Sequence, residues 1–146
     1  MMPDHDALAR THAAAFRNDR GWSAVELAEL LSQTSTVFVG DPDAFLIGRV
    51  IGDEAEILTL ATAPALRRRG LAKAVLATFL EDAASRGVTS TVLEVASDNA
   101  PAKALYAAFG FQEAARRPGY YRRADGTTVD ALLLRRLSPH RDPLQA

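Results

Sequence analysis

The 146-residue sequence has no cysteine, no long apolar run and no excess of charge of one sign. The lack of cysteine excludes disulfides, thiolate zinc sites and cysteine nucleophiles. No apolar run approaches the roughly 20 residues of a membrane span. The formal net charge of −1 provides no overall basic field to attract nucleic acid. His5, His12 and His140 lack metal-ligand spacing, so we expect no metal site and place them at the surface or on helices.

The remaining composition is that of one soluble globular domain, with 48% apolar and 24% charged residues. The N-terminus, MMPDHDALAR, lacks the features of a signal peptide, so we expect a cytoplasmic protein that does not bind a membrane. We expect a single domain over residues 1–137. Residues 138–146 are polar, contain two prolines and are predicted to form a mobile tail.

Hydrophobic periodicity and turn residues predict alternating helices and strands. Helices are expected at residues 7–16, after Ser23, from Leu71 to near Gly87, and at residues 101–109. Ser23 and Glu26 have the spacing of a capping box. Strands are expected at residues 36–39, 45–50, 57–62 and 88–95, followed by a hairpin of 111–116 and 129–135 with a long connection. Residues 17–21 read as a polar break.

The stretch ILTLATAPALRRRGLAK, residues 57–73, combines an apolar strand, a basic turn and the start of a helix. Pro64 ends the strand because it has no N–H group for a ladder. Gly70 allows close backbone approach, and the first turn of the following helix offers unpaired N–H groups and the positive end of its dipole. This arrangement favours an anion site. The alternative interpretation is a charged helix end on the surface.

A second pattern lies between Glu94 and Phe111. Asn99 and Tyr106 are seven residues apart on a predicted helix, and therefore share one face. The helix follows the apolar strand that carries Glu94, and Gly110 ends it.

Together the two patterns resemble a known family. Arg67-x-x-Gly70-x-Ala72 resembles the acetyl-CoA pyrophosphate loop of the GNAT (Gcn5-related) N-acetyltransferases, and the Asn99 and Tyr106 helix resembles the other half of that signature. The run from Leu93 to Val95, with the later Tyr120–Tyr121, is similar to the RimI-type ribosomal-protein-alanine N-acetyltransferases. The resemblance implies an α/β GNAT fold: a mixed sheet of six or seven strands, splayed between the fourth and fifth, with about four helices. Because the N-terminus is short, the first strand is expected to be stunted or missing.

The resemblance also implies the site residues. Glu94 matches the general base and Tyr106 the general acid, while Glu54 and Glu56 are rival bases. The resemblance assigns Tyr120 and Tyr121 to the acceptor. Acetyl-CoA, the expected cosubstrate, would contact the remaining site residues: Leu60, Ala61, Thr62, Arg67, Arg68, Arg69, Gly70, Leu71, Ala72, Lys73 and Asn99. Chemistry supports an acid and a base, because an amine must be neutral to attack a thioester and the departing thiolate takes a proton.

The implied reaction is direct acetyl transfer from acetyl-CoA to a protein N-terminal α-amine, of the ribosomal protein S18 alanine type. A small amine as acceptor, and a non-catalytic acetyl-CoA-binding regulatory module, are the alternatives. Ala96 stands where the RimI type commonly has arginine, and Arg122-Arg123 where a proline is usual, so the identity of the acceptor stays open. We expect no direct nucleic-acid partner and a monomer or weak dimer.

Overall fold

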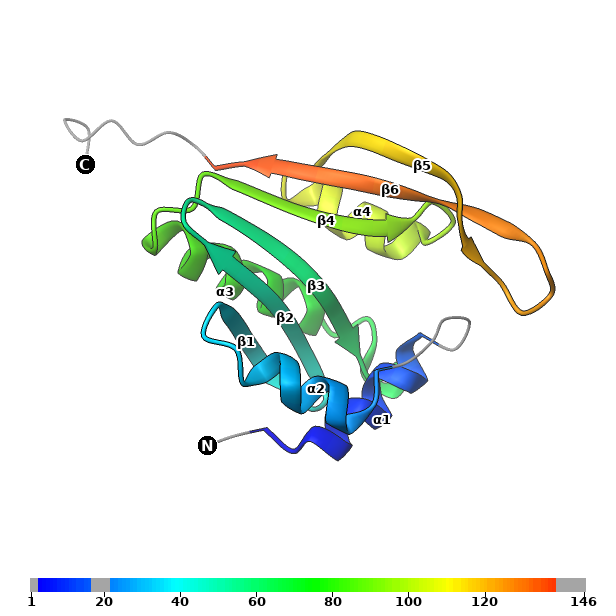
Figure 1. Ribbon diagram of the computed structural model, residues 1–146, viewed down its shortest axis with the longest axis horizontal. Coiled ribbons are helices and arrows are strands. Elements are labelled where there is room, and N and C mark those ends of the chain that lie inside the picture. The colour runs from blue at the N-terminus through cyan, green and yellow to red at the C-terminus, as the bar shows by residue number, and fades with distance from the viewer. Residues whose placement is uncertain (1–2, 17–21, 139–146) are drawn as a thin grey trace.

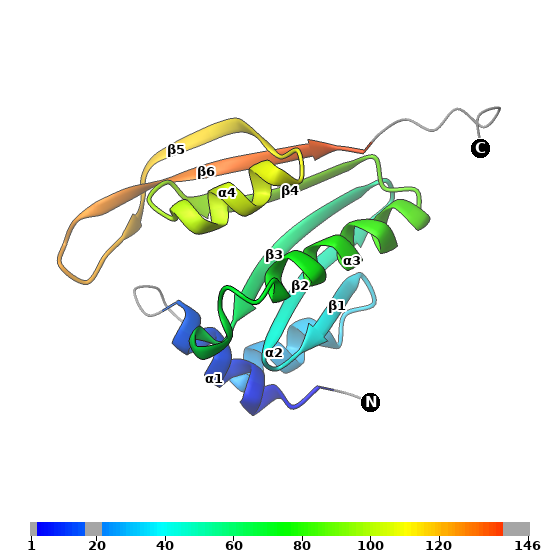
Figure 2. The same cartoon turned by 180° about the vertical axis from the view of Figure 1, so that it is seen from behind.

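The structure, a computed structural model, describes residues 3–16 and 22–138. The polar break expected at residues 17–21 and the tail after residue 138 lie outside the described residues. A six-stranded mixed sheet carries helices on both faces, as Figures 1 and 2 show from opposite sides. None of the described helices has the length and apolar character to cross a membrane.

Two helices precede the first strand, and their ends are set by side-chain caps. Helix α1, His5–Ala15, begins at Asp4, whose carboxylate accepts from the N–H groups of Asp6 and Ala7. Helix α2, Ala24–Leu31, begins with the capping box predicted between Ser23 and Glu26. The described residues before Thr36 therefore form helices, and they contain no additional first strand.

Strands β1 (Thr36–Asp41), β2 (Ala44–Ile51) and β3 (Glu54–Thr62) form an antiparallel meander. Alternation along β2 directs Ala44 and Leu46 toward one core and Phe45 and Ile47 toward another. The first core lies under α3 and the second under α1 and α2. Leu58 is an extra residue in β3, because Ile47 pairs with Thr59 and Gly48 with Ile57. Bulges of this kind bend a strand and often lie beside functional sites.

A short 3-10 turn at Pro64–Leu66 follows β3, and helix α3, Leu71–Ser85, begins after Gly70. Its buried face packs on β1, β2 and β3. Strand β4, Ser90–Ala96, then leads into helix α4, Ala100–Ala108, which Asn99 caps. Gly87 and Gly110 follow the ends of these two helices with φ of +85° and +88°, as expected for helix stops.

The final hairpin is longer than predicted. Strand β5 runs over Gln112–Arg122 and β6 over Thr128–Leu137. The prediction of a long connection after Arg116 is therefore wrong. Pro118 and Gly119 are strand breakers by sequence. They fall in a bulge, however, because Arg117 pairs with Ala131 and Tyr121 pairs with Val129. A proline is tolerated there because β5 is an edge strand.

The sheet order is β1-β2-β3-β4-β6-β5, and the β3–β4 pair is its one parallel pair. This pair is short, from Glu54 opposite Ser90 to Ile57 opposite Leu93. Beyond Leu93 the two strands diverge, as Figures 1 and 2 show. This divergence is the splay that was expected between the fourth and fifth strands. It lies between β3 and β4 here because, among the described residues, the expected first strand is absent and each later strand is numbered one lower.

Candidate active site

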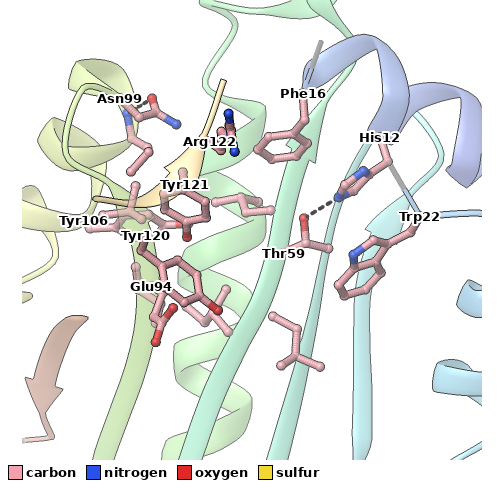
Figure 3. Close-up of a pocket in the computed structure, with 17 residues that line it drawn as sticks. His12, Phe16, Trp22, Thr59, Glu94, Asn99, Tyr106, Tyr120, Tyr121 and Arg122 are labelled. Carbon is pink, nitrogen blue, oxygen red and sulfur yellow. Dashed lines mark hydrogen bonds between the residues drawn. The ribbon is translucent and has the colours of Figure 1, made fainter. Parts of the chain in front are cut away.

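A cavity of about 630 Å³ lies where β3 and β4 diverge. Strands β3, β4 and β5 and helices α1 and α4 all contribute to its wall. Figure 3 shows Glu94 and the tyrosines on one side, and His12, Phe16 and Trp22 on the other. The lining residues are His12, Phe16, Trp22, Ile57, Leu58, Thr59, Leu60, Leu93, Glu94, Val95, Ala96, Asn99, Ala102, Tyr106, Tyr120, Tyr121 and Arg122.

Glu94 projects into this cavity from β4, one residue beyond the last β3–β4 pair. Its side chain is 30% exposed, and its Oε1 forms an ion pair with Nη2 of Arg117 at 3.2 Å. The rival carboxylates Glu54 and Glu56 are exposed on β3 and do not line the cavity. The structure thus brings one of the three candidate bases into the cavity.

Tyr106 lies on α4 and is 6% exposed. Its ring packs edge-on against Phe111 at 5.5 Å between centroids. Burial raises the pKa of Tyr106 to about 12, from an ordinary 10.0. The phenol therefore stays protonated at neutral pH and is a hydrogen-bond donor beside the cavity.

Asn99 is the N-cap of α4, and its Oδ1 accepts from the N–H of Ala102 at 3.2 Å. Like Tyr106, it lines the cavity, although it precedes the first residue of the helix. The cap uses the amide oxygen, and the amide nitrogen is left as a potential donor to a ligand.

Tyr120 and Tyr121 form the β5 wall, with their rings edge to face at 5.1 Å. The bulge that presents them is held by Asp130 of β6. Its carboxylate accepts from the Gly119 N–H and from Arg116, each at 2.9 Å. These two hydrogen bonds, the backbone one first, hold the pKa of Asp130 below its ordinary value.

The opposite wall comes from α1 and the start of α2, and sequence reasoning did not identify it. His12 is on a helix, as expected, but it is buried, with Nε2 3.1 Å from Oγ1 of Thr59. Its ring lies 4.6 Å from that of Phe16 and is stacked on Trp22 at 5.5 Å. One signal in the sequence was that His12 lies near one helix face with Leu8 and Phe16.

The predicted anion loop lies outside this cavity, because residues 67–73 are not among the lining residues. Gly70 has φ of +76°, and Arg68, unusually for a non-glycine residue, has φ of +67°. Helix α3 has no side-chain cap, so its first N–H groups are not used by a cap. Arg67 donates to the carbonyl of Ala15 and so ties the loop to α1 at 3.2 Å.

The three strand residues expected to face the cosubstrate differ in position. Leu60 lines the cavity, whereas Ala61 is buried in the α1–α2 core and Thr62 pairs with Ala44. All three follow the last β3–β4 pair, so their edge of β3 is not covered by β4. Backbone N–H and C=O groups along this edge are available for an added extended chain. Among the described residues, no cluster of His, Asp and Glu has the arrangement of a metal site.

Comparisons with known proteins agree with this architecture. The sequence profile of the Acetyltransferase (GNAT) family matches residues 7–111. Ribosomal protein bS18-alanine N-acetyltransferase of Escherichia coli (strain K12) is 40% identical over 95 residues, or 65% of this chain and 64% of that enzyme. The chain thus matches slightly less than two thirds of the length of this curated relative.

Solved structures extend the likeness to nearly the whole chain. The crystal structure of the ribosomal-protein-S18-alanine N-acetyltransferase from Escherichia coli has a TM-score of 0.85 and 30% identity, covering 96% of this chain and 91% of that one. Arabidopsis thaliana NAA60 in complex with acetyl-CoA has a TM-score of 0.77 at 18% identity, covering 93% and 95%. The second likeness is one of fold.

Proposed function

Because the chain belongs to the acetyltransferase (GNAT) family, we propose that it transfers the acetyl group of acetyl-CoA to the α-amine of a protein N-terminus. The observation that carries this proposal is the joint presence of Glu94 and Tyr106 in the cavity at the β3–β4 divergence. A carboxylate and a protonated phenol are the base and the acid that the reaction needs. A module that only binds acetyl-CoA has no use for this pair.

The chain offers suitable groups for acetyl-CoA, which supplies an activated acetyl thioester when bound. An added Cβ on Gly70 would meet no atom within 4 Å, so the backbone there is open to a close ligand. The uncapped start of α3, with its dipole, would hold the pyrophosphate. This cradle comprises Arg67, Arg68, Arg69, Gly70, Leu71, Ala72 and Lys73. The backbone of Leu60, Ala61 and Thr62 and the Asn99 amide would hold the pantetheine arm.

In the proposed mechanism Glu94 accepts a proton from the acceptor amine as the nitrogen bonds to the acetyl carbon. Tyr106 donates its phenolic proton to the departing thiolate as the carbon–sulfur bond breaks, and recovers a proton from solvent. Backbone N–H groups at Leu60 and Thr62 would stabilise the oxyanion. One proton leaves the nitrogen and one proton reaches the sulfur. The reaction is therefore balanced and requires no further reactant.

The acceptor that we propose is an N-terminal alanine of a ribosomal protein of the bS18 type. The named activity of the Escherichia coli relatives supports this choice. The cavity supports it too, because aromatic rings form both walls: His12, Phe16 and Trp22 face Tyr106, Tyr120 and Tyr121. An aromatic groove suits an extended peptide, whereas a small polar amine would be expected to need a closed polar pocket. Such an acceptor is made in the cytoplasm, where we propose that the protein acts.

The test is to incubate the protein with acetyl-CoA and peptides that begin with the alanine of a bacterial bS18. The same peptides with a blocked N-terminus control for side-chain transfer, and a panel of polyamines and amino acids represents small acceptors. Mass spectrometry should find one added acetyl group on the free α-amine alone. Transfer only to the small amines would overturn the peptide assignment. Acetyl-CoA binding without transfer to any amine would overturn the enzymatic one.

A further inference from the structure

Arg117 contacts the proposed base, although the acid–base pair does not require it. Its Nη2 forms an ion pair with Oε1 of Glu94 at 3.2 Å, and its guanidinium carbon lies 5.2 Å from the centroid of the Tyr120 ring. The Arg117 side chain is 62% exposed, so packing in the core does not explain why it lies beside Glu94. Among the described residues, Oε1 of Glu94 is paired with Arg117 and no ion pair is recorded for Oε2.

The sheet register explains how an arginine of the edge strand reaches a residue two strands away. Arg117 pairs with Ala131, and Ala131 pairs with Ala96, so these three side chains form a row on the face that bears Glu94. Two alanines leave room for the long side chain to extend diagonally across β6. The bulge begins directly after Arg117, and the hydrogen bond from Gly119 to Asp130 fixes it.

The other arginines of β5 and its end have different partners. Arg116 pairs with Glu113 and Asp130, while Arg123 pairs with Asp98. Arg122 lines the cavity and has no acidic partner among the described residues. The contact with Glu94 is therefore specific to position 117 and does not reflect a uniformly basic strand.

We propose that Arg117 is a positioning residue of the transfer reaction: by occupying one oxygen of Glu94 it directs the other toward the acceptor amine, and its charge disfavours the ammonium form of that amine. This inference rests on the proposed acetyl transfer. The physical reason is that the amine must be neutral to attack, and a nearby cation opposes a second positive charge. Oε2 is then the free oxygen that receives the proton.

The remaining ionisable groups around Glu94 do not duplicate this charge. Strand β3 contributes no ionisable side chain to the cavity, and Glu94 pairs with apolar Leu133 of β6. The ionisable groups that share the cavity with Glu94 are Tyr106 of α4, Tyr120, Tyr121 and Arg122 of β5, and His12 of α1. Of these, Arg122 alone has a permanent positive charge, and it does not contact Glu94.

The test compares pH–rate profiles of the wild type, Arg117→Met and Arg117→Lys with a peptide acceptor. Methionine keeps the apolar stem and removes the charge, whereas lysine keeps the charge without the planar fork. Arg135→Met is the matched control, because Arg135 lies exposed on β6 away from the cavity. The profile of kcat reports groups in the enzyme–substrate complex, where the bound amine is beside Arg117.

In Arg117→Met the acidic limb of the pH profile of kcat should move to higher pH by about one unit. This is the low end of the pKa shift that a neighbouring charge causes, and it is expected here because solvent screens the partly exposed site. At pH values below the limb, kcat should fall about tenfold, while the acetyl-CoA Kd and the thermal midpoint stay unchanged. Lysine should restore at least half of the shift, and Arg135→Met should show none.

An unmoved kcat limb in Arg117→Met, with transfer intact in the wild type, would overturn the inference and leave the proposed function standing. A lower acceptor KM with unchanged kcat in Arg117→Met would also overturn the inference. Arg117 would then only compete with the cationic acceptor for Glu94 and would not assist the reaction. Absence of transfer by the wild type to any amine would instead refute the proposed function.

Discussion

Replacing Gly70 with valine tests whether the start of α3 binds the pyrophosphate. Gly70 has φ of +76°, and a Cβ added there would meet no atom within 4 Å. The folded protein thus has room for the side chain but would be strained by it, because the left-handed conformation costs a residue with a Cβ about 1–2 kcal/mol. The valine methyl groups would extend into the space that we assign to the phosphates.

Gly87→Val is the matched control, because Gly87 has φ of +85°, has the same open surroundings and follows the other end of α3. Both variants should lose about 1–2 kcal/mol of stability, which lowers the thermal midpoint by about 3–8 °C in a chain of this size.

Only Gly70→Val should lose acetyl-CoA affinity, by at least about tenfold, or about 1.4 kcal/mol. Isothermal titration calorimetry below both midpoints measures the affinity directly. If both variants lost stability while Gly70→Val bound acetyl-CoA as tightly as the wild type, the loop could not be the phosphate site.

Two further substitutions probe the walls of the cavity. Burial raises the pKa of Tyr106 from 10.0 to about 12, because the folded protein favours the protonated phenol. The stability that depends on this proton is fully present below pH 10 and is lost as the pH rises through 12. Between pH 9 and 11.5, urea unfolding of the wild type should show a loss about 2 kcal/mol larger than that of Tyr106→Phe; equal losses would contradict the buried, protonated phenol. Asp130→Asn removes one of the two hydrogen bonds that hold the bulge near Tyr120, worth about 1 kcal/mol. Steady-state kinetics should show an acceptor KM about fivefold higher, with unchanged acetyl-CoA Kd; a rise in that Kd instead would refute a role confined to the acceptor wall.

The sequence predicted those parts of the fold that depend on local signals. The capping box at Ser23 and the helix start after Gly70 are each decided within a few residues. The strand lengths at β1 and β2 were predicted to within two residues at each end, because their apolar residues are bounded by turn residues.

The extent of β5 could not be predicted in this way. Pro118 and Gly119 are strand breakers in isolation, and the strand continues because Asp130, on the neighbouring strand, accepts the Gly119 N–H. That hydrogen bond is a tertiary contact between residues that the prediction treated as a loop and a strand. Local propensity has no access to it.

The candidate site was predicted unevenly for the same reason. Glu94, Asn99 and Tyr106 were predicted because they lie in one continuous strand–helix stretch that resembles a GNAT signature. The wall of His12 and Trp22 was missed, because α1 meets β3 through a contact between residues 47 apart, His12 and Thr59. Arg117 was missed because its partner Glu94 lies two strands away in the sheet.

The most direct test of the central claim is acetyl transfer by Glu94→Gln across pH, with Glu56→Gln as the matched control on β3. Glutamine keeps the size of the side chain and removes the base, so at neutral pH kcat should fall by about 10²–10⁴-fold. Raising the pH should partly restore the rate, because the free amine then no longer needs a base. Glu56→Gln should transfer acetyl groups at the wild-type rate. Wild-type rates in Glu94→Gln, with a loss in Glu56→Gln, would contradict the account and move the base to β3.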